Sequence, residues 1–223
     1  MNSRCIYIVI IFTFISCIDV PKVKSISSTN KEIQTKFDIS TKDTFNIIAW
    51  RSYIGWRGFS VGSSCSGKLK VKSGFLVISD SLKVLGGEFV LDMKSLTVIS
   101  LKGKDKENVE NYLLGNVLGA TNLFFSTEEY PEAKFIITNN YVDIYNKNIL
   151  EGTLEVKGIV KEIEGFSINY DVQNDKLILS ASDFDIDRNR WNINYGNESK
   201  IIDLKERMIK DNIRIKFKLY FDL

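Results

Sequence analysis

The sequence contains no histidine, and this absence narrows the functions open to it. Histidine is the usual general base near neutral pH, a common ligand of zinc and iron, and the partner that activates a nucleophilic serine or cysteine. A hydrolase built on a Ser-His or Cys-His pair is therefore excluded. The chain is predicted to be no enzyme and to use no cofactor and no metal.

An excess of charge of one sign is also missing, because 30 Lys and Arg face 28 Asp and Glu. Proteins that bind nucleic acid usually carry a marked basic excess on one face. The balance predicts no nucleic-acid partner, although it leaves room for a local basic patch.

Cysteine is scarce, and the N-terminus accounts for most of it. Residues 1–16 contain the apolar run Cys5–Ile15, which is too short to span a bilayer and is typical of a secretory signal peptide. The run ends in Phe14-Ile15-Ser16-Cys17, which resembles the lipobox of bacterial lipoproteins. The resemblance implies cleavage before Cys17 and lipidation of that residue, which leaves Cys65 as the remaining thiol and permits no intramolecular disulfide. The alternative is an ordinary secretory signal cut elsewhere.

The rest of the chain divides into a tether and a folded domain. Residues 17–42 are rich in Ser, Thr and Lys without an apolar period, which predicts a flexible tether. Residues 43–223 are long enough for one large all-β domain.

Alternation of apolar and polar residues is the strongest pattern in this domain. In Ile213–Leu223, apolar residues at odd positions alternate with Arg214, Lys216 and Lys218, which is the period of a strand with one dry and one wet face. The same pattern recurs in segments ending at Lys72, Lys157 and Val172. One-sided strands predict an antiparallel sheet wrapped around an apolar interior.

Further elements follow from spacing and turn residues. Strands are expected at 134–138, 141–145, 149–157, 160–172 and 176–187, with Asn- and Asp-rich turns between them. A bent first strand is expected over 45–59, where Arg51 and Arg57 stand beside Trp50 and Trp56 either as surface pairs or as a cation–π site for a headgroup. An amphipathic helix over 105–118 is expected, with Asp105 as a cap and Gly119 at its end, and a second helix over 201–210.

Several short motifs, in order, are similar to those of the YceI-like family of lipocalin-like polyisoprenoid-binding proteins. They are Gly86-Gly87-Glu88-Phe89, Leu91-Asp92-Met93-Lys94-Ser95-Leu96, Phe124-Phe125 with Tyr130-Pro131-Glu132-Ala133-Lys134-Phe135, Leu154-Glu155-Val156-Lys157-Gly158-Ile159, and Asp187-Arg188-Asn189-Arg190-Trp191-Asn192-Ile193-Asn194-Tyr195-Gly196. Two histidines of the family are absent, with Cys65 and Val117 near their places, so no polar or metal site is carried over. The resemblance implies a single antiparallel up-and-down β-barrel of about eight strands with one or two short helices at its ends.

The resemblance also implies carriage of a polyisoprenoid or isoprenoid quinone in the barrel lumen. Candidate lumen residues occupy the alternate strand positions that are expected to face the apolar interior. They are Leu69, Val71, Phe89, Leu91, Phe135, Ile137, Leu154, Val156, Phe166, Ile168, Ile213, Ile215 and Phe217. The predicted location is the bacterial cell envelope, anchored through Cys17 and facing the periplasm or the cell surface, as a monomer or a homodimer.

Other interpretations remain open at this point. A barrel filled by side chains would make the chain an anchored interaction or stress-response protein without a ligand. An enzyme could use Glu88 and Asp92, although both would oppose the dry face of their strand. Asp183, Asp185 and Asp187 have the alternate spacing of calcium ligands, but an EF-hand loop would need Gly in place of Arg188. Arg188 and Trp191 are expected at a structural corner or at the mouth.

Overall fold

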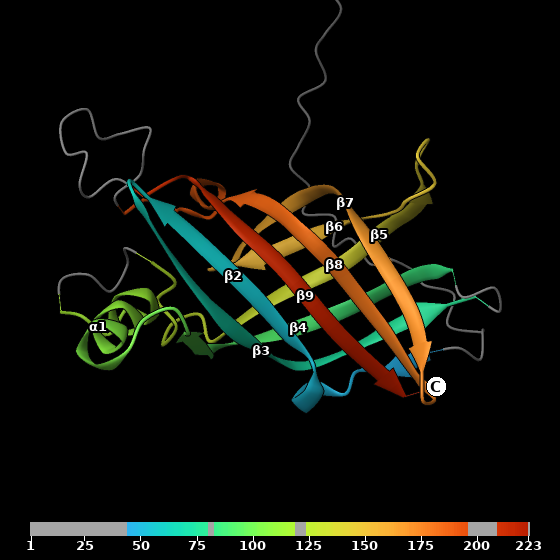
Figure 1. The fold of residues 1–223 in the computed structure, drawn as a ribbon, viewed down its shortest axis with the longest axis horizontal. Helices are drawn as coiled ribbons and strands as arrows, with labels where there is room; N and C mark the ends of the chain where they lie inside the picture. The colour runs from blue at the N-terminus through green and yellow to red at the C-terminus, as the bar shows by residue number, and fades with distance from the viewer. Residues whose placement is uncertain (1–43, 80–82, 119–123, 196–208, 223) are drawn as a thin grey trace, which may run out of the picture. The chain divides into compact units, whose positions relative to one another are not determined.

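The structure, a computed structural model, describes residues 44–79, 83–118, 124–195 and 209–222 (Figure 1). The signal peptide, the tether with Cys17 and most of the helix expected over 201–210 lie outside these residues. The elements are β1 (Thr44–Asn46), η1 (Ala49–Arg51), β2 (Tyr53–Ser60), β3 (Ser63–Ile78), β4 (Val84–Val98), α1 (Gly103–Leu114), β5 (Glu132–Val142), β6 (Asn148–Val156), β7 (Ile159–Gln173), β8 (Lys176–Asp187), η2 (Arg188–Trp191) and β9 (Asn212–Asp222). Within the described ranges, no helix is long and apolar enough to cross a bilayer.

Strands β2 to β9 form a closed, antiparallel, up-and-down barrel of eight strands, as the alternation and the family resemblance together predict. Each strand pairs with its neighbours in sequence, and β2 closes the barrel against β9 from Tyr53↔Lys218 to Arg57↔Arg214. In β9 the inward residues Leu219 and Phe221 are only 2% and 0% exposed. Because every barrel strand has both of its partners within residues 53–222, a polypeptide of residues 40–223 leaves no barrel strand without a partner and is expected to fold by itself.

The first strand bends, as expected, and the bend has a defined structure. β1 pairs with β3 through Phe45↔Leu76, the short helix η1 follows, and β2 then continues beside β3. Ile47 forms an isolated bridge with Phe221 of β9, and the N–H of Ile48 donates to the carbonyl of Tyr220 at 2.7 Å. The start of the domain therefore lies beside its end.

One predicted turn is wrong, because Asn139 and Asn140 do not reverse the chain. They belong to β5, which has a bulge between Ile137 and Asn139 and runs on to Val142. The turn follows, where the Asp143 side chain accepts the N–H groups of Tyr145 and Lys147 at 2.9 and 2.8 Å. The segments 134–138 and 141–145 are thus parts of one strand and its turn.

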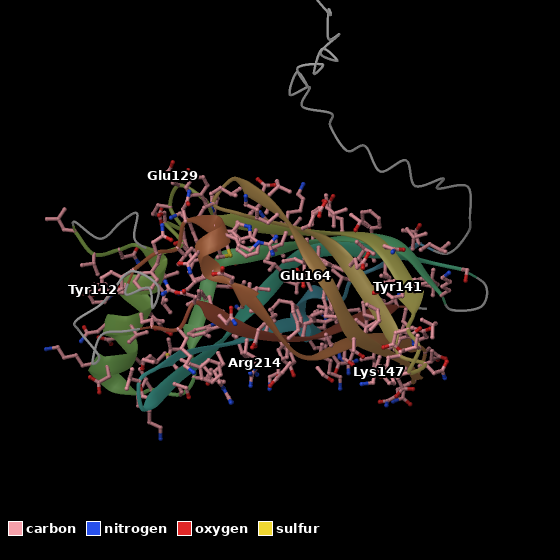
Figure 2. All side chains as sticks on the ribbon, turned by 90° about the horizontal axis from the view of Figure 1, so that it is seen from above. Tyr112, Glu129, Tyr141, Lys147, Glu164 and Arg214 are labelled. Carbon is pink, nitrogen blue, oxygen red and sulfur yellow. The ribbon has the colours of Figure 1, made fainter. Side chains whose placement is uncertain are left out.

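The helix lies at one end of the barrel, but its ends differ from those expected. α1 stops at Gly115, whose left-handed φ of 84° places the C-cap four residues before Gly119. Its N-cap is Lys102, without a side-chain cap, and Asp105 lies in the first turn. Tyr112 of α1 marks this end of the barrel, whereas Tyr141 and Lys147 mark the opposite end (Figure 2).

An apolar cavity at the α1 end of the barrel

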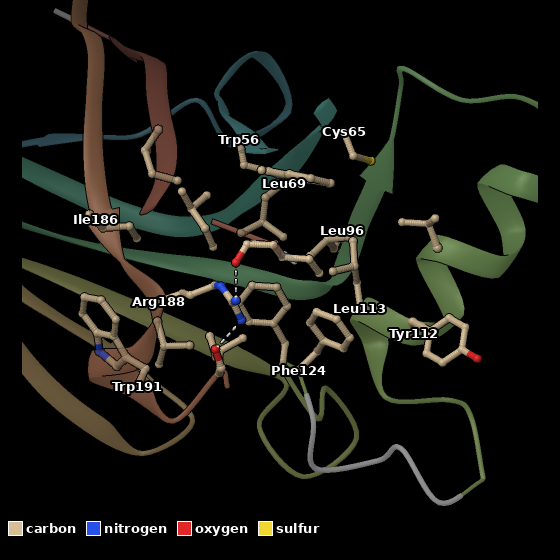
Figure 3. Close-up of a pocket in the computed structure, with 18 of the residues that line it drawn as sticks. Trp56, Cys65, Leu69, Leu96, Tyr112, Leu113, Phe124, Ile186, Arg188 and Trp191 are labelled. Atoms are coloured by element: carbon tan, nitrogen blue, oxygen red, sulfur yellow. Dashed lines mark hydrogen bonds between the residues drawn. The ribbon is translucent and has the colours of Figure 1, made fainter. Parts of the chain in front are cut away.

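An apolar cavity of about 540 Å³ occupies the barrel end next to α1 (Figure 3). Ligand pockets in proteins measure about 300–1,000 Å³ and have mostly hydrophobic walls. The walls come from inward residues of the strands, from α1 and from the Phe124-Phe125 segment. The described lining comprises Ile54, Trp56, Gly58, Phe59, Ser60, Ser63, Ser64, Cys65, Leu69, Leu91, Met93, Leu96, Leu101, Val109, Tyr112, Leu113, Phe124, Phe125, Ala133, Leu154, Val156, Ile186, Arg188, Trp191, Ile193, Tyr195, Ile209, Ile213 and Ile215.

The candidate lumen residues divide between this cavity and a packed core. Six of them line the cavity, namely Leu69, Leu91, Leu154, Val156, Ile213 and Ile215. The others belong to the hydrophobic core or pack against it: Val71, Phe89, Phe135, Ile137, Phe166, Ile168 and Phe217. The shared parity places both groups inside the barrel, but only the first group can touch a molecule held in the cavity.

Aromatic rings pack the barrel interior next to the cavity. Phe166 stacks on Phe184 with ring centroids 4.1 Å apart and planes 6° apart. The Phe217 ring meets Phe166 edge-on at 5.9 Å, and Phe135 approaches Phe166 at 6.1 Å. Such ring pairs contribute about 0.5–1.5 kcal/mol beyond their buried area. The cavity thus has a packed floor.

Arg188 is a buried charge held mainly by backbone carbonyls of neighbouring loops. Its side chain is 2% exposed, and burial lowers the pKa of the guanidinium. Nη1 donates to the carbonyls of Ile193 at 2.6 Å and Tyr195 at 2.9 Å, while Nη2 and Nε donate to Ile209 at 3.0 Å and Lys210 at 3.2 Å. Asp211 adds an ion pair at 3.8 Å. Arg188 lies across the cavity from α1 (Figure 3), and we call this cluster the arginine clamp.

Two tryptophans shape the cavity walls next to the strands. Trp191, 1% exposed, donates its indole N–H to the carbonyl of Leu154 at 3.0 Å, which ties η2 to β6. Trp56 packs over Gly67, where a Cβ would lie only 2.4 Å from the Trp56 ring and 2.0 Å from the carbonyl oxygen of Thr97. The glycine is therefore required for the tryptophan to lie flat against the wall.

Cys65 lies on the cavity wall at the end of β3 near α1. The thiol is half-buried, and burial raises its pKa, while a 3.7 Å hydrogen bond from Ser100 acts in the opposite direction. A raised pKa disfavours the thiolate. Cys65 therefore suits a structural position, and the rate at which its thiol is labelled can report on whether the cavity is occupied.

The helix α1 forms one wall of the cavity. Val109 and Leu113 face the cavity, and none of the α1 residues is buried. Glu110 attaches the helix to β4, because its Oε1 accepts the Thr97 hydroxyl and the Val98 N–H, both at 2.7 Å. Partial burial of the Glu110 carboxylate opposes its ionisation, but these bonds and Lys106 outweigh it and lower its pKa.

Replacing Glu110 with Gln should destabilise the protein by about 1–2 kcal/mol at pH 7, because two hydrogen bonds to a charged acceptor are weakened. A carboxylate whose folded pKa is depressed stabilises the fold above its unfolded pKa, near 4.3, and loses that contribution as the pH falls through the folded value. Urea melts of the wild type and the variant should therefore differ at pH 7 and converge near pH 2–3. Glu107→Gln, exposed on the same helix, is the control. A difference that persists at low pH would contradict this role.

The acidic residues considered for chemistry lie away from the cavity. Glu88 forms an ion pair with Lys134 at 3.5 Å, and Asp92 accepts the N–H of Lys94 at 3.1 Å. Asp185 accepts two hydrogen bonds from Arg214, which lower the pKa of its carboxyl. These carboxylates point outward, as their parity predicts, and the described cavity lining includes none of them.

A closed antiparallel barrel with an apolar cavity at one end defines a lipocalin-like binding barrel. The chain belongs to the YceI-like domain family, whose model matches residues 45–221, as the sequence motifs predict. No curated protein sequence matches the chain.

Two solved structures share the fold. Burkholderia cenocepacia BcnA has a TM-score of 0.59 at 16% identity, covering 78% of this chain and 98% of its own. A polyisoprenoid binding domain from Saccharophagus degradans, implicated in plant cell wall breakdown, has a TM-score of 0.53 at 14% identity, covering 80% of this chain and 97% of its own. At these identities the likeness concerns the fold.

Proposed function

We propose that this protein binds a long-chain apolar lipid, such as a polyisoprenoid or an isoprenoid quinone, in the cavity beside α1 and carries it without chemical change. The observation that carries the proposal is the cavity itself, which is apolar, closed below by aromatic rings and large enough for a ligand. The polyisoprenoid binding domain with the same fold supports the ligand class.

The polarity of the walls sets the direction in which such a lipid enters. Among the described lining residues, Arg188 alone carries a charge, and its donors are directed at backbone carbonyls. A buried headgroup would therefore meet no free cation. Ser60 at the end of β2 and Ser63 and Ser64 at the start of β3 line the cavity. We infer that the hydrocarbon chain lies inside and that the headgroup stays near these hydroxyls.

The energetics favour a ligand with a long apolar chain. Burying hydrocarbon contributes about 0.8 kcal/mol per CH₂. Ten buried carbons would contribute about 8 kcal/mol, which falls within the cost of about 4–15 kcal/mol for association. A chain of more than about ten buried carbons is therefore needed for stable binding.

The proposed place of action is the bacterial cell envelope. A signal peptide over 1–16 and lipidation at Cys17 would anchor the barrel to a membrane, with residues 17–42 as the tether. Their support is the lipobox-like sequence and the composition of the segment.

Ligand binding can be tested by mass spectrometry of organic extracts of residues 40–223 produced in a bacterial periplasm. We expect a prenyl lipid or quinone at a stoichiometric amount. Delipidated protein should then take the lipid up again, and bound lipid should slow maleimide labelling of Cys65, which lies on the cavity wall.

A matched control comes from the same strand. In a Cys65→Ser, Ser73→Cys double variant the thiol lies at an exposed position of β3, and its labelling rate should not respond to lipid. An empty extract, together with unchanged Cys65 labelling after exposure to prenyl lipids, would refute the carrier and favour an interaction protein without ligand.

A further inference from the structure

The outer surface of three adjacent strands carries a regular array of cations. The pairing of β2 with β3 and β9 aligns three rows across the barrel wall: Lys70–Tyr53–Lys218, Lys68–Gly55–Lys216 and Ser66–Arg57–Arg214. Figure 1 shows β2 and β9 side by side on one face of the barrel. We call the six cations of these rows, on β3, β2 and β9, the basic wall.

The spacing of the basic wall follows from strand geometry. Residues two apart in a strand are separated by about 7 Å, and positions on the outer two of three strands by about 10 Å. Arg57 and Arg214 stand directly opposite each other, an arrangement that is normally destabilising for like charges. Arg214 is offset by Asp185, which accepts two of its hydrogen bonds at 2.9 and 3.3 Å.

The remaining cations of the basic wall are available to a partner. Lys68 lies 4.7 Å from the ring centroid of Tyr53, and Lys218 lies 5.3 Å from that of Tyr220. Within the described ranges, the only ion pair that involves the basic wall is the one between Arg214 and Asp185. Asp92 stands opposite Lys70 in the pairing of β3 with β4. When Asp92, Asp183 and Asp185 are all counted against the six cations, three positive charges remain on a protein whose net charge is +2.

A hollow of about 260 Å³ lies in the basic wall and has space for a polar group. Four cations of the wall border it, and Gly55 and Gly67 contribute no side chain to its floor. Asp183 stands at its border as well. The balance of charge at the hollow favours an anion such as a phosphate group.

An exposed tryptophan adjoins the basic wall. Trp50 of η1 is 86% exposed and directly precedes the link to β2. The Arg51 guanidinium lies 5.7 Å from the Trp50 ring centroid and 4.6 Å from that of Tyr220, the next outward residue of β9 after Lys218. Tryptophan is enriched where proteins meet the headgroup region of a bilayer.

We propose that the basic wall and Trp50 form the surface by which the barrel lies on an anionic lipid bilayer. The cations would meet lipid phosphates, and the indole would enter the headgroup region. Trp50 follows shortly after β1, the first strand of the domain, so the exposed indole lies near the point where a membrane anchor at the start of the chain would join the barrel. The proposal does not depend on what the cavity holds.

Sedimentation of residues 40–223 with phosphatidylglycerol vesicles tests this surface. Each cation near an anionic membrane is worth about fivefold in affinity, so Lys68→Gln with Lys216→Gln should weaken binding about 25-fold. The matched control, Lys104→Gln with Lys147→Gln, removes the same charge from exposed sites outside the basic wall. Phosphatidylcholine vesicles should bind none of the three proteins, and added salt should release the wild type from phosphatidylglycerol vesicles.

Tryptophan emission gives a second measurement. Vesicles should shift the emission of the wild type but not of Trp50→Phe, because Trp191 is 1% exposed and Trp56 is half-buried. The proposal is overturned if both charge variants lose equal affinity, if the shift survives in Trp50→Phe, or if the basic wall binds an acidic protein but no vesicles. An empty cavity in the extraction experiment leaves these outcomes unchanged.

Discussion

Replacing Arg188 with Ala should destabilise the protein by about 3–5 kcal/mol, the typical loss when one side of a buried charged network is removed. Four backbone carbonyls would lose their donor, and those of Ile193 and Tyr195 lie on one side of the residue 196–208 segment while those of Ile209 and Lys210 lie on the other. The arginine clamp therefore holds both flanks of that segment against the barrel. Differential scanning calorimetry should show a melting temperature lower by about 6–20 °C.

Two further variants separate the clamp from general effects of charge. Arg190→Ala removes an exposed arginine of the same short helix that makes one backbone bond, to Glu162, and should cost less than about 1 kcal/mol. Arg188→Lys keeps the charge but not the planar fork of donors, so an intermediate loss is expected. Equal stability of Arg188→Ala and Arg190→Ala would show that the clamp contributes nothing.

Replacing Ala133 with Trp should abolish lipid uptake without unfolding the barrel. Ala133 is 3% exposed, lies on the cavity wall and pairs with Leu91, another lining residue. The indole would enter space that the ligand needs, and a drop in affinity of more than tenfold is expected. Lipid uptake and thermal melting of residues 40–223 measure the two effects.

The stability of the Ala133→Trp variant also distinguishes a lipid carrier with an open cavity from a barrel filled by side chains. Adding bulk to a packed core costs about 1–3 kcal/mol, whereas an open cavity accepts it with little loss. Thr138→Trp places the same side chain at an exposed position of β5 and should affect neither lipid uptake nor stability. A destabilised Ala133→Trp protein would mean that the cavity is closed in solution.

Much of the fold could be predicted from the sequence because alternation reports directly on which face of a strand is buried. In β9 the alternation from Ile213 to Phe221 identifies the inner face correctly, and the family motifs add the closure of the barrel. Turn-forming residues are a weaker guide to where the chain reverses. The Asn139-Asn140 pair has turn-forming residues, but it lies in a bulged strand, and Asp143 makes the turn instead.

The cavity could be predicted only in part, because parity identifies the interior and does not show which part of it is filled. Phe166 and Leu154 share the same inward parity, yet one packs in the aromatic floor and the other lines the cavity. The alternation of inward and outward residues is also interrupted in β4, where Ser95 lies in a bulge. The Ser95 hydroxyl donates to the carbonyl of Asp92 and accepts the N–H of Lys70. Met93 and Leu96 therefore both face inward, although they are three positions apart.

The contacts that Arg188 makes with other loops cannot be predicted from the sequence around it. The partners of Arg188 are backbone carbonyls, which any residue provides, so the clamp is visible only in the folded chain. The Asp-Arg motif that resembles the family's was the one indication that this position matters.

The contact between Ile47 and Phe221 has a practical consequence for work with this barrel. Both ends of the domain leave it at the end with the aromatic floor, opposite α1 and the cavity. A fusion partner or surface linkage attached at either terminus would therefore keep clear of the opening, and the same closeness suits the chain for circular permutation, with new termini in one of the hairpin turns. The barrel could thus be immobilised as a lipid sensor with its binding end turned toward the solution.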